Sequence, residues 1–313
     1  MRLEANASKS GMTGLAFLKI GVGARQTSLG SAVTTLRDDP NNMFWNPAGI
    51  YSLSHKTQIA FSYNNWLLDL QHITLAYVSK NYRAGTIGIG FNWLGFGDIP
   101  ADRDVAPPGF EIYQMDERQT ETYGFSDLSL QITYSYQFKS NYVFGATLKY
   151  LRETIDRQAA TAFAWDFGVL YPVDWRHLTI GARLNNLGSD IRFYQINAPI
   201  PLQFAMGVSL ALAEDANSSL ILYSDLIKPQ DYHQLYYGGL EYIFRDEISL
   251  RGGYKFGYHH QNRMDDSRDS DEGLSLGSGI YIPLGDYLLQ IDYSFTRFSL
   301  FSDTHRFSFL FRF

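Results

Sequence analysis

The sequence predicts an all-β protein: one 14-stranded antiparallel transmembrane β-barrel with an N-terminal hatch or plug segment. Three observations carry this prediction: a period-two alternation of apolar and polar residues, an asymmetry between short and long connections, and an aromatic C-terminal strand. We assign residues 1–50 to the hatch or plug segment and residues 51–313 to the barrel, within one domain overall.

Composition excludes several classes of protein. The chain has 313 residues, no cysteine and a formal net charge of −6, and Phe, Tyr and Trp make up 16% of it. Without cysteine, a disulfide framework, thiolate-bound zinc, an iron–sulfur cluster and a thiol nucleophile are excluded. The mild acidity gives no basic surface for nucleic acid, and no uncharged apolar run reaches the roughly 18 residues of a transmembrane helix. The many aromatic side chains must therefore be buried or face something other than water.

Period-two alternation predicts the strands. Between Leu128 and Phe138 every even position is apolar or aromatic and every odd position is Ser, Thr or Gln, so such a strand has one apolar and one polar face. The pattern recurs between turn residues, without a convincing amphipathic helix. We predict fourteen strands, at residues 55–64, 69–79, 84–97, 124–138, 141–154, 160–171, 176–187, 201–213, 218–227, 234–244, 246–258, 273–282, 286–298 and 304–313.

The connections between these strands differ in length. Links that follow even-numbered strands are short, such as residues 139–140 and 283–285, whereas links after odd-numbered strands include residues 98–123, 188–200 and 259–272. Short turns at one end and long loops at the other are typical of outer-membrane barrels, and an even strand number returns the C-terminus to the periplasmic side.

The last strand argues against the alternative of a large soluble sandwich pair or propeller. Phe307, Phe309, Phe311 and Phe313 lie in phase and end the chain. Such a strand would be an aggregation hazard at the edge of a soluble sheet. It is similar to the C-terminal signal by which the barrel-assembly machinery recognises outer-membrane proteins. We therefore expect the apolar strand faces to meet outer-membrane lipid.

The opposite strand faces then line the lumen. They carry charges of both signs, which can pair across neighbouring strands and offset the cost of their desolvation. A barrel of this size encloses more space than its own side chains fill, so another segment should occupy part of it. The lumen residues we predict are Gln131, Lys149, Asp166, Arg183, Asn185, Gln203, Asp225, Glu241, Arg251, Asp292 and Arg312.

The N-terminal block is the candidate for that segment, although it could also be a surface loop leading into the barrel. Gly21, Gly23 and Gly30 permit close packing and positive φ, and residues 46–49 (Asn-Pro-Ala-Gly) form a turn signal. If the block enters the lumen, Arg25 and either Asp38 or Asp39 are candidate partners for the wall.

Several motifs resemble the PorV/PorQ family, which is similar in turn to FadL-type fatty-acid transporters with fourteen strands and an N-terminal hatch. The motifs are FLKIGVGAR at 17–25, LGSA at 29–32 and DDP…WNPAGI at 38–50, and further matches lie at 144–156, 162–172, 178–188 and 303–313. The hatch residues they assign are Phe17, Lys19, Gly21, Gly23, Arg25, Gly30, Asp38, Asp39, Asn46, Pro47, Ala48 and Gly49.

The resemblance implies an outer-membrane protein associated with type IX protein secretion, which binds secreted cargo proteins or subunits of the secretion system. The alternative is a FadL-like passive transporter of a hydrophobic ligand, gated by the hatch. In that alternative the apolar hatch residues line a pocket. These residues are Leu15, Phe17, Leu18, Ile20 and Met43.

No arrangement of residues indicates an enzyme, a metal site or a cofactor. Residues 265–272 lack the ligand order of a calcium loop and are interpreted as a solvated loop, and Ser302 to His305 would point to alternating sides of a strand end. Trp66, Trp93, Trp165 and Trp175 fit an interfacial aromatic belt. The first residues lack a signal-peptide pattern, so we expect a mature form from the outer membrane of a diderm bacterium, its signal peptide removed.

Overall fold

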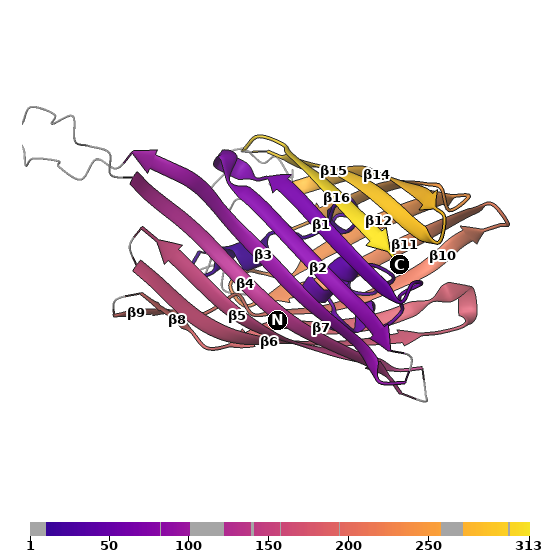
Figure 1. Ribbon diagram of the computed structural model, residues 1–313, viewed down its shortest axis with the longest axis horizontal. Coiled ribbons are helices and arrows are strands. Elements are labelled where there is room, and N and C mark those ends of the chain that lie inside the picture. The colour runs from indigo at the N-terminus through magenta and orange to yellow at the C-terminus, as the bar shows by residue number, and fades with distance from the viewer. Residues whose placement is uncertain are drawn as a thin grey trace, which may run out of the picture.

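Fourteen antiparallel strands close into a barrel (Figure 1), as predicted. The computed structural model describes residues 11–81, 83–100, 122–138, 141–156, 158–193, 195–257, 272–299 and 301–313. The barrel strands are β1 Thr57–Asn65, β2 Gln71–Asn81, β3 Gly85–Pro100, β4 Thr122–Gln137, β5 Val143–Ile155, β6 Gln158–Pro172, β7 Thr179–Gly188, β10 Gln203–Glu214, β11 Ser218–Pro229, β12 Leu235–Phe244, β13 Ile248–Phe256, β14 Glu272–Leu284, β15 Tyr287–Phe298 and β16 Thr304–Arg312.

The last strand closes the barrel against the first. In the antiparallel β1–β16 pair, Phe307 lies opposite Tyr63 and Phe309 lies opposite Phe61. The side chains of Phe307, Phe311 and Phe313 are exposed on the outside and Phe309 is half-buried. The aromatic ladder is thus part of the outer surface at the closing seam, and its role as an assembly signal stays a prediction.

The two ends of the barrel differ, and we name them here. At the turn end lie the connections β2–β3, β4–β5, β10–β11, β12–β13 and β14–β15, together with Phe313 at the C-terminus. At the mouth end, odd-numbered strands such as β3 and β5 finish, and the β7–β10 connection is found there (Figure 1). The predicted long loops at 98–123 and 259–272 fall mostly on residues 101–121 and 258–271, which lie outside the described residues.

Two predictions about the connections are wrong in detail. Residues 188–200, expected to be a loop, contain a separate hairpin of β8 Ile191–Phe193 and β9 Ile196–Ala198. Its strands have three residues each, too few for a period-two pattern to be recognised. Residues 175–177, where we expected β7 to begin, form a 3-10 turn with Arg176 at φ 47°, and β7 starts only at Thr179.

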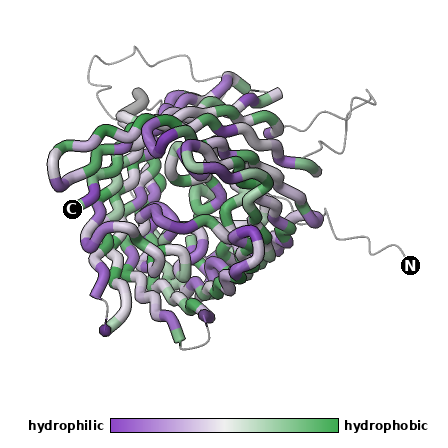
Figure 2. The backbone as a smooth tube through the Cα atoms, turned by 90° about the vertical axis from the view of Figure 1, so that its right-hand side faces the viewer, coloured by the Kyte–Doolittle hydropathy of each residue, from purple (hydrophilic) through white to green (hydrophobic). Residues whose placement is uncertain are grey.

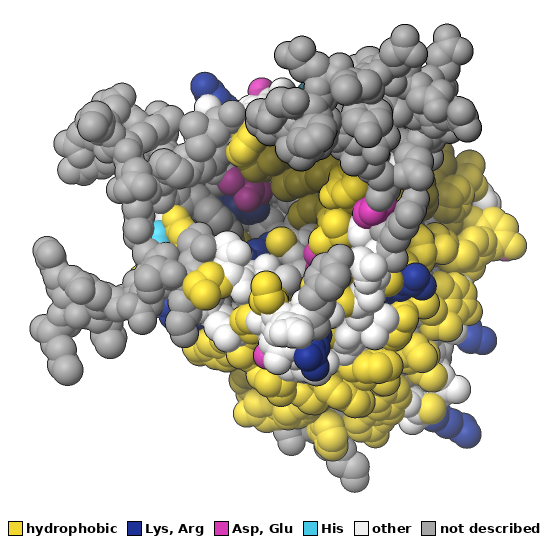
Figure 3. Space-filling view, turned by 90° about the vertical axis from the view of Figure 1, so that its left-hand side faces the viewer, with side chains coloured by type: hydrophobic (Ala, Val, Ile, Leu, Met, Phe, Trp, Pro, Cys, Tyr) yellow, Lys and Arg dark blue, Asp and Glu magenta, His cyan; other side chains and the backbone are white. Residues whose placement is uncertain are grey.

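The strands have one polar and one apolar face. Ten of the eleven predicted lumen residues are buried, and Gln203 is half-buried. On the opposite face large apolar residues are exposed, among them Ile132 at 60% and Phe163 at 57%. The space-filling view from the mouth end shows this hydrophobic outer surface and charged side chains within the hollow (Figure 3). None of the helices in the described part of the chain has both the length and the apolar composition needed to cross a membrane.

Residues 11–56 precede the first strand, and from Gly21 to Ile50 almost all of them are buried. Figure 2, viewed from the turn end, shows backbone crossing the interior of the ring of strands. This N-terminal segment contains four short helices, the α-helix α1 (Ala24–Ser28) and 3-10 helices at Ala16–Lys19, Pro40–Phe44 and Pro47–Ile50.

Local sequence explains the last two of these helices. Proline occupies the first position of each, where its fixed φ suits a helix and its missing N–H costs nothing. The preceding Asp39 and Asn46 cap them: Asp39 Oδ1 accepts from the Asn41 N–H at 2.8 Å, and Asn46 Oδ1 accepts from the Ala48 N–H at 3.1 Å.

Candidate functional site: the N-terminal segment in the lumen

A buried chain of charges joins α1 to the barrel wall. Arg25 donates two hydrogen bonds to Glu241 of β12, from Nε to Oε1 and from Nη2 to Oε2, both at 2.9 Å. Arg251 of β13 donates to the same carboxylate at 2.8 Å and to Asp292 of β15 at 2.7 Å. Tyr223 also donates to Glu241, at 3.0 Å. The sequence names Arg25 as a plug residue, and the structure identifies its partner.

The electrostatics of this contact favour the charged arginine. Burial lowers the pKa of Arg25, but the facing Glu241 carboxylate raises it more, so the net shift is upward. Two-point contact between a guanidinium and a carboxylate fixes orientation as well as charge. Removing either partner would leave a charge buried inside the barrel, which is expensive. The pair therefore fastens the N-terminal segment to β12.

Hydrogen bonds from other wall residues hold the segment at two further points. Asp225 Oδ2 of β11 accepts from the Val33 and Thr34 N–H groups, both at 2.9 Å, and from the Thr34 hydroxyl at 2.7 Å. The Asn185 amide of β7 donates to the Trp45 carbonyl oxygen at 2.7 Å. The wall thus satisfies backbone groups of an irregular segment that would otherwise be buried without partners.

Glycines on the lumen face of the wall receive two turns of the segment. Gly145 of β5 and Gly168 of β6 lie directly opposite each other, and a Cβ on either would collide with the Asn-Pro-Ala turn at 46–48. Gly239 of β12 and Gly253 of β13 are likewise paired, and a Cβ on either would collide with the turn at Leu29. We call these pairs the first and second glycine sockets.

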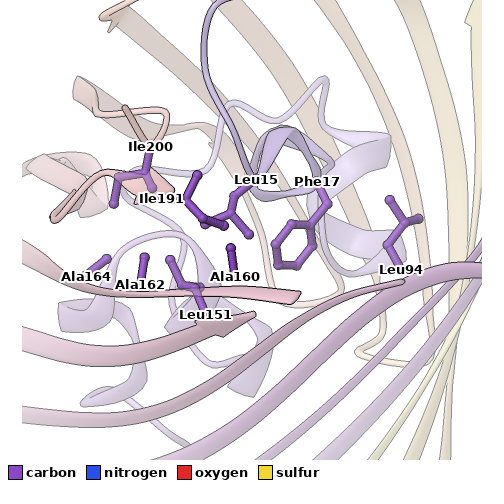
Figure 4. Packing of buried hydrophobic residues seen from close by; sticks show 9 residues of the cluster. All are labelled: Leu15, Phe17, Leu94, Leu151, Ala160, Ala162, Ala164, Ile191 and Ile200. Carbon is purple, nitrogen blue, oxygen red and sulfur yellow. The ribbon is translucent and has the colours of Figure 1, made fainter. Parts of the chain in front are cut away.

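An apolar cluster lies in the lumen near the mouth end. Leu15 and Phe17 pack with Leu94 of β3, Leu151 of β5 and Ile191 of the β8–β9 hairpin. Figure 4 shows Leu15 directed at Ile191, and Phe17 lying between Leu15 and Leu94. We call this the mouth cluster. Its other members are Ala160, Ala162, Ala164 and Ile200, with Leu18, Ile20, Trp66, Leu70, Phe125, Phe193 and Ala198 packed against it.

Polar contacts of the segment flank this cluster. Lys19 forms an ion pair with Asp231, in the β11–β12 connection, and the Thr13 hydroxyl donates to the same carboxylate at 3.0 Å. The Leu15 N–H donates to Glu153 of β5 at 3.0 Å. Met43, grouped with Leu15 and Phe17 from sequence, lies elsewhere and packs with Ile50 and strand residues of β1 and β2 near the turn end.

Asp38 and Asp39, the two acidic residues predicted to contact the wall, have different partners. Asp38 faces Arg312 of β16 at 4.0 Å and accepts from the Gln58 amide at 3.1 Å. Asp39 contacts no basic group in the described part of the chain and serves as a helix cap. Burial raises the pKa of Asp39, whereas Arg25 and the Asn41 N–H lower it, and the net direction is upward.

Other predicted residues are also placed. Gly23 precedes α1 at φ 84°, and Gly30, at φ 62°, lies so close to β13 that a side chain there would meet the Tyr254 nitrogen at 2.6 Å.

The tryptophans predicted to form an interfacial belt differ in exposure. Trp165 and Trp175 are exposed, as expected of a belt. Trp66 is not: it is half-buried against the mouth cluster and makes an edge-to-face contact with Phe298. The prediction for Trp66 was wrong because it lies just past β1, where the strand alternation stops.

A polar cavity of about 370 Å³ lies at the turn end between the segment and the wall. Arg37 and Asp38 contribute from the segment, and Ser209, Glu214 and Ser219 contribute from β10 and β11. Its lining is mainly hydroxyl and charged groups, in contrast to the mouth cluster. Toward the turn end the described lumen therefore holds both this cavity and the apolar cluster around Met43 and Ile50.

The sequence did not identify the glycine sockets as functional positions. Their signal was nevertheless present, because glycine weakens a strand and often marks a close approach of another backbone. Gly145, Gly168 and Gly253 stand at positions in phase with lumen residues such as Lys149, Asp166 and Arg251. Which turn each one receives depends on three-dimensional contacts that no local pattern encodes.

Comparisons with known proteins agree with this architecture. The family described as "Uncharacterised protein family (UPF0164)" matches residues 3–169. No curated protein sequence matches the chain.

Solved structures share the fold at low sequence identity. The toluene transporter TbuX of Ralstonia pickettii is 12% identical with a TM-score of 0.59, covering 94% of this chain and 98% of its own. The toluene transporter TodX of Pseudomonas putida is 12% identical with a TM-score of 0.59, and the match covers 93% of this chain and 97% of TodX. A FadL homologue of Pseudomonas aeruginosa is 11% identical with a TM-score of 0.54, and the match covers 93% of this chain and 96% of the homologue. These similarities establish a FadL-type barrel fold.

Proposed function

The chain belongs to the UPF0164 family, and from its fold and its filled lumen we propose that it is an outer-membrane transporter that admits a small hydrophobic molecule past a movable N-terminal plug. The mouth end would face outward and the turn end would face the periplasm, as in other single-chain barrels. This proposal describes a passive, non-enzymatic protein.

The mouth cluster is the observation that carries the proposal. Its apolar residues come both from the N-terminal segment, through Leu15 and Phe17, and from the wall, through Leu94, Leu151 and Ile191. A hydrophobic molecule that replaced the Leu15 and Phe17 side chains would find the same apolar wall contacts. The free energy of burying its own apolar surface, about 25 cal/mol per Å², would offset the loss of the Leu15 and Phe17 contacts.

Polar groups beyond the mouth cluster restrict the path that a hydrophobic ligand can take. Between the mouth cluster and the turn end lie the Arg25–Glu241 pair, the Asp225 contacts and the hydroxyl-lined cavity. A hydrophobic molecule gains nothing from these groups and would need to desolvate them. Passage therefore requires the N-terminal segment to shift, or the ligand to leave sideways from the mouth cluster.

Similar proteins favour the same ligand class. Two of the solved structures above are toluene transporters by their own descriptions. Toluene is therefore the probe we choose for testing the proposal, without assigning it as the natural ligand.

A reversible cross-link tests whether the plug must move. The Thr27 hydroxyl on α1 lies 3.1 Å from the Ser294 hydroxyl on β15, so Thr27→Cys with Ser294→Cys places two thiols in position to bond. The chain has no cysteine of its own, so this disulfide would be the only one. In diderm cells expressing the variant, we expect oxidation to abolish uptake of labelled toluene and a reductant to restore it.

A matched disulfide within the wall provides the control. The hydroxyls of Thr133 on β4 and Thr147 on β5 are 2.8 Å apart, so Thr133→Cys with Thr147→Cys joins two neighbouring strands without touching the plug. Oxidation should leave its uptake unchanged. Uptake by the wild type no faster than by cells lacking the protein would overturn transport, and unchanged uptake by the oxidised plug variant would overturn the moving plug.

Type IX secretion is the second candidate function, and the N-terminal motifs that resemble PorV/PorQ favour it. Such a role would use connections at the mouth end, of which residues 101–121 and 258–271 lie outside the described residues. Binding of secreted cargo there would not need the plug to move. Co-purification of secretion subunits from the native host, with equal yield from the oxidised and reduced plug variants and no toluene uptake, would favour this role over transport.

A further inference from the structure

Arg306 of β16 is a buried cation that has no acidic partner within ion-pair distance in the described part of the chain. Its side chain faces the lumen in the half nearer the mouth and is 4% exposed. Among the described residues it forms no ion pair, and its one polar contact is with Asn64 of β1: when the Asn64 amide is oriented with its oxygen toward Arg306, that oxygen accepts from Nη2 at 2.9 Å. In the same orientation the Asn64 amide nitrogen donates to the His305 carbonyl oxygen at 3.1 Å.

Other basic side chains of the lumen contact carboxylates or several neutral groups. Arg251 contacts Glu241 and Asp292, and Lys149 lies 2.6 Å from Asp166. Arg183, which also forms no ion pair among the described residues, donates to Thr34 and Asn185 and lies over the Trp45 ring. Lys255 pairs with Glu272, the carboxylate whose charge acts on Arg306 from a distance.

The wall around Arg306 is polar and uncharged. Its partners across the two neighbouring strands are Asn64 and Ser294. Thr304 and Ser308 lie two positions away on the same face of β16. Asn64 is opposite His72 of β2, whose Nε2 lies 2.7 Å from the Asn92 amide oxygen.

Apolar surface begins only at the edges of this patch. The register places Leu94 of the mouth cluster next to His72. Leu94 is therefore three strand spacings, or about 14 Å, from Arg306 along the wall. The Trp66–Phe298 aromatic pair marks the strand ends on the mouth side. The surroundings of Arg306 therefore suit a compact hydrophilic group better than the body of a hydrophobic molecule.

From this geometry we propose that Arg306, with Asn64 and the neighbouring hydroxyl groups, forms a binding site for a compact oxyanion such as phosphate or a short carboxylate. A buried guanidinium is costly without a counter-charge, and its planar set of donors matches the oxygens of an oxyanion. The inference goes beyond the proposed function, because this polar patch on β15, β16, β1 and β2 is separate from the mouth cluster.

Two variants and one control test this site. Arg306→Gln removes the guanidinium. Asn64→Asp keeps Arg306 and places a carboxylate 2.9 Å from Nη2, where it would occupy the site from within. Arg245→Gln removes a charge from the β12–β13 turn and serves as the control. A shift between heated and unheated bands on a gel verifies that each variant has folded into a barrel.

The measurement is the thermal unfolding temperature in detergent, with inorganic phosphate titrated at constant ionic strength against chloride. We expect a saturable rise in the wild type and in Arg245→Gln. Dissociation constants should be at least roughly tenfold weaker in Arg306→Gln and in Asn64→Asp, by loss of one charge-assisted contact pair. Acetate should behave as phosphate does.

Three results would overturn the proposal: no response of the wild type to phosphate or acetate, an equal response in Arg306→Gln, or an undiminished response in folded Asn64→Asp. A fourth arm with octanoate separates the source of the anionic group. An Arg306-dependent response to octanoate without one to phosphate or acetate would assign the site to the head of an amphiphile and contradict a compact ligand. None of these results depends on toluene uptake, so the two proposals can fail separately.

Discussion

Arg25 shows how a single residue holds the N-terminal segment. Its guanidinium makes a two-point contact with Glu241, and both side chains are buried in the lumen. Arg25→Gln should destabilise the seated plug by roughly 3 kcal/mol, the low end for breaking a buried pair, because Arg251 still neutralises part of Glu241. Tryptic cleavage after Arg37, which requires the segment to leave the wall, should become on the order of a hundredfold faster.

The partner variant separates charge from packing in this prediction. Glu241→Gln should have a similar effect alone, and the double variant should cost clearly less than the sum, since both changes remove the same contact. Additive effects would show that Arg25 acts through its packing and not through the ion pair.

Residue-level prediction from sequence succeeded where the chemistry was local. Asn46 and Pro47 were recognised as a turn because an Asn side chain caps its own following backbone, and the structure has that contact. The partner of Arg25 was missed, since Glu241 lies 216 positions away and was recognised only as a lumen residue. Asp38 and Asp39 were the acidic groups nearest in sequence, but the fold directs Arg25 to β12.

The strands are the elements that position the plug, and their glycines give a test at this scale. Gly252 and Gly253 are neighbours on β13 that face opposite ways. A Cβ on Gly252 has its nearest neighbour at 3.5 Å, an ordinary contact with Leu276, whereas a Cβ on Gly253 would overlap the Leu29–Gly30 backbone. Gly253→Val should therefore displace the turn at 29–30, at a cost of roughly 1–3 kcal/mol.

Gly252→Val supplies the comparison, because it adds the same side chain to the same strand. Hydrogen exchange of the 24–36 backbone should accelerate in Gly253→Val and stay unchanged in Gly252→Val. Equal exchange in both variants would mean that the second glycine socket does not hold the segment in place.

At the level of elements, alternation located all fourteen barrel strands, because one face meets an apolar surrounding and the other a polar one over nine or more residues. The β8–β9 hairpin has too few residues to show that contrast. Its Ile191 packs on Leu15 in the mouth cluster, so an unpredicted element contributes to the candidate site. Hydrophobic periodicity also could not predict the short helices of the N-terminal segment, since each spans only four or five residues.

The whole molecule is a barrel whose interior holds its own N-terminal segment, and conductance through the barrel tests what that segment does. If the segment is the hatch we propose, deleting residues 1–50 should raise single-channel conductance in planar bilayers well above that of the intact chain. A heat-dependent gel shift would verify that the shortened chain still closes into a barrel. Conductance equal to that of the full chain would contradict a plugging role.

The position of the segment at the start of the chain constrains how the protein folds. Contacts of α1 reach β12 and β15, more than two hundred residues later. Contacts this distant in sequence carry a high cost in loop-closure entropy until the chain between them is ordered. The segment therefore cannot settle before nearly every strand exists, and the seam between β1 and β16 must close around it or admit it afterwards. The segment that precedes the strands in sequence is thus among the last parts of the chain to reach its native contacts.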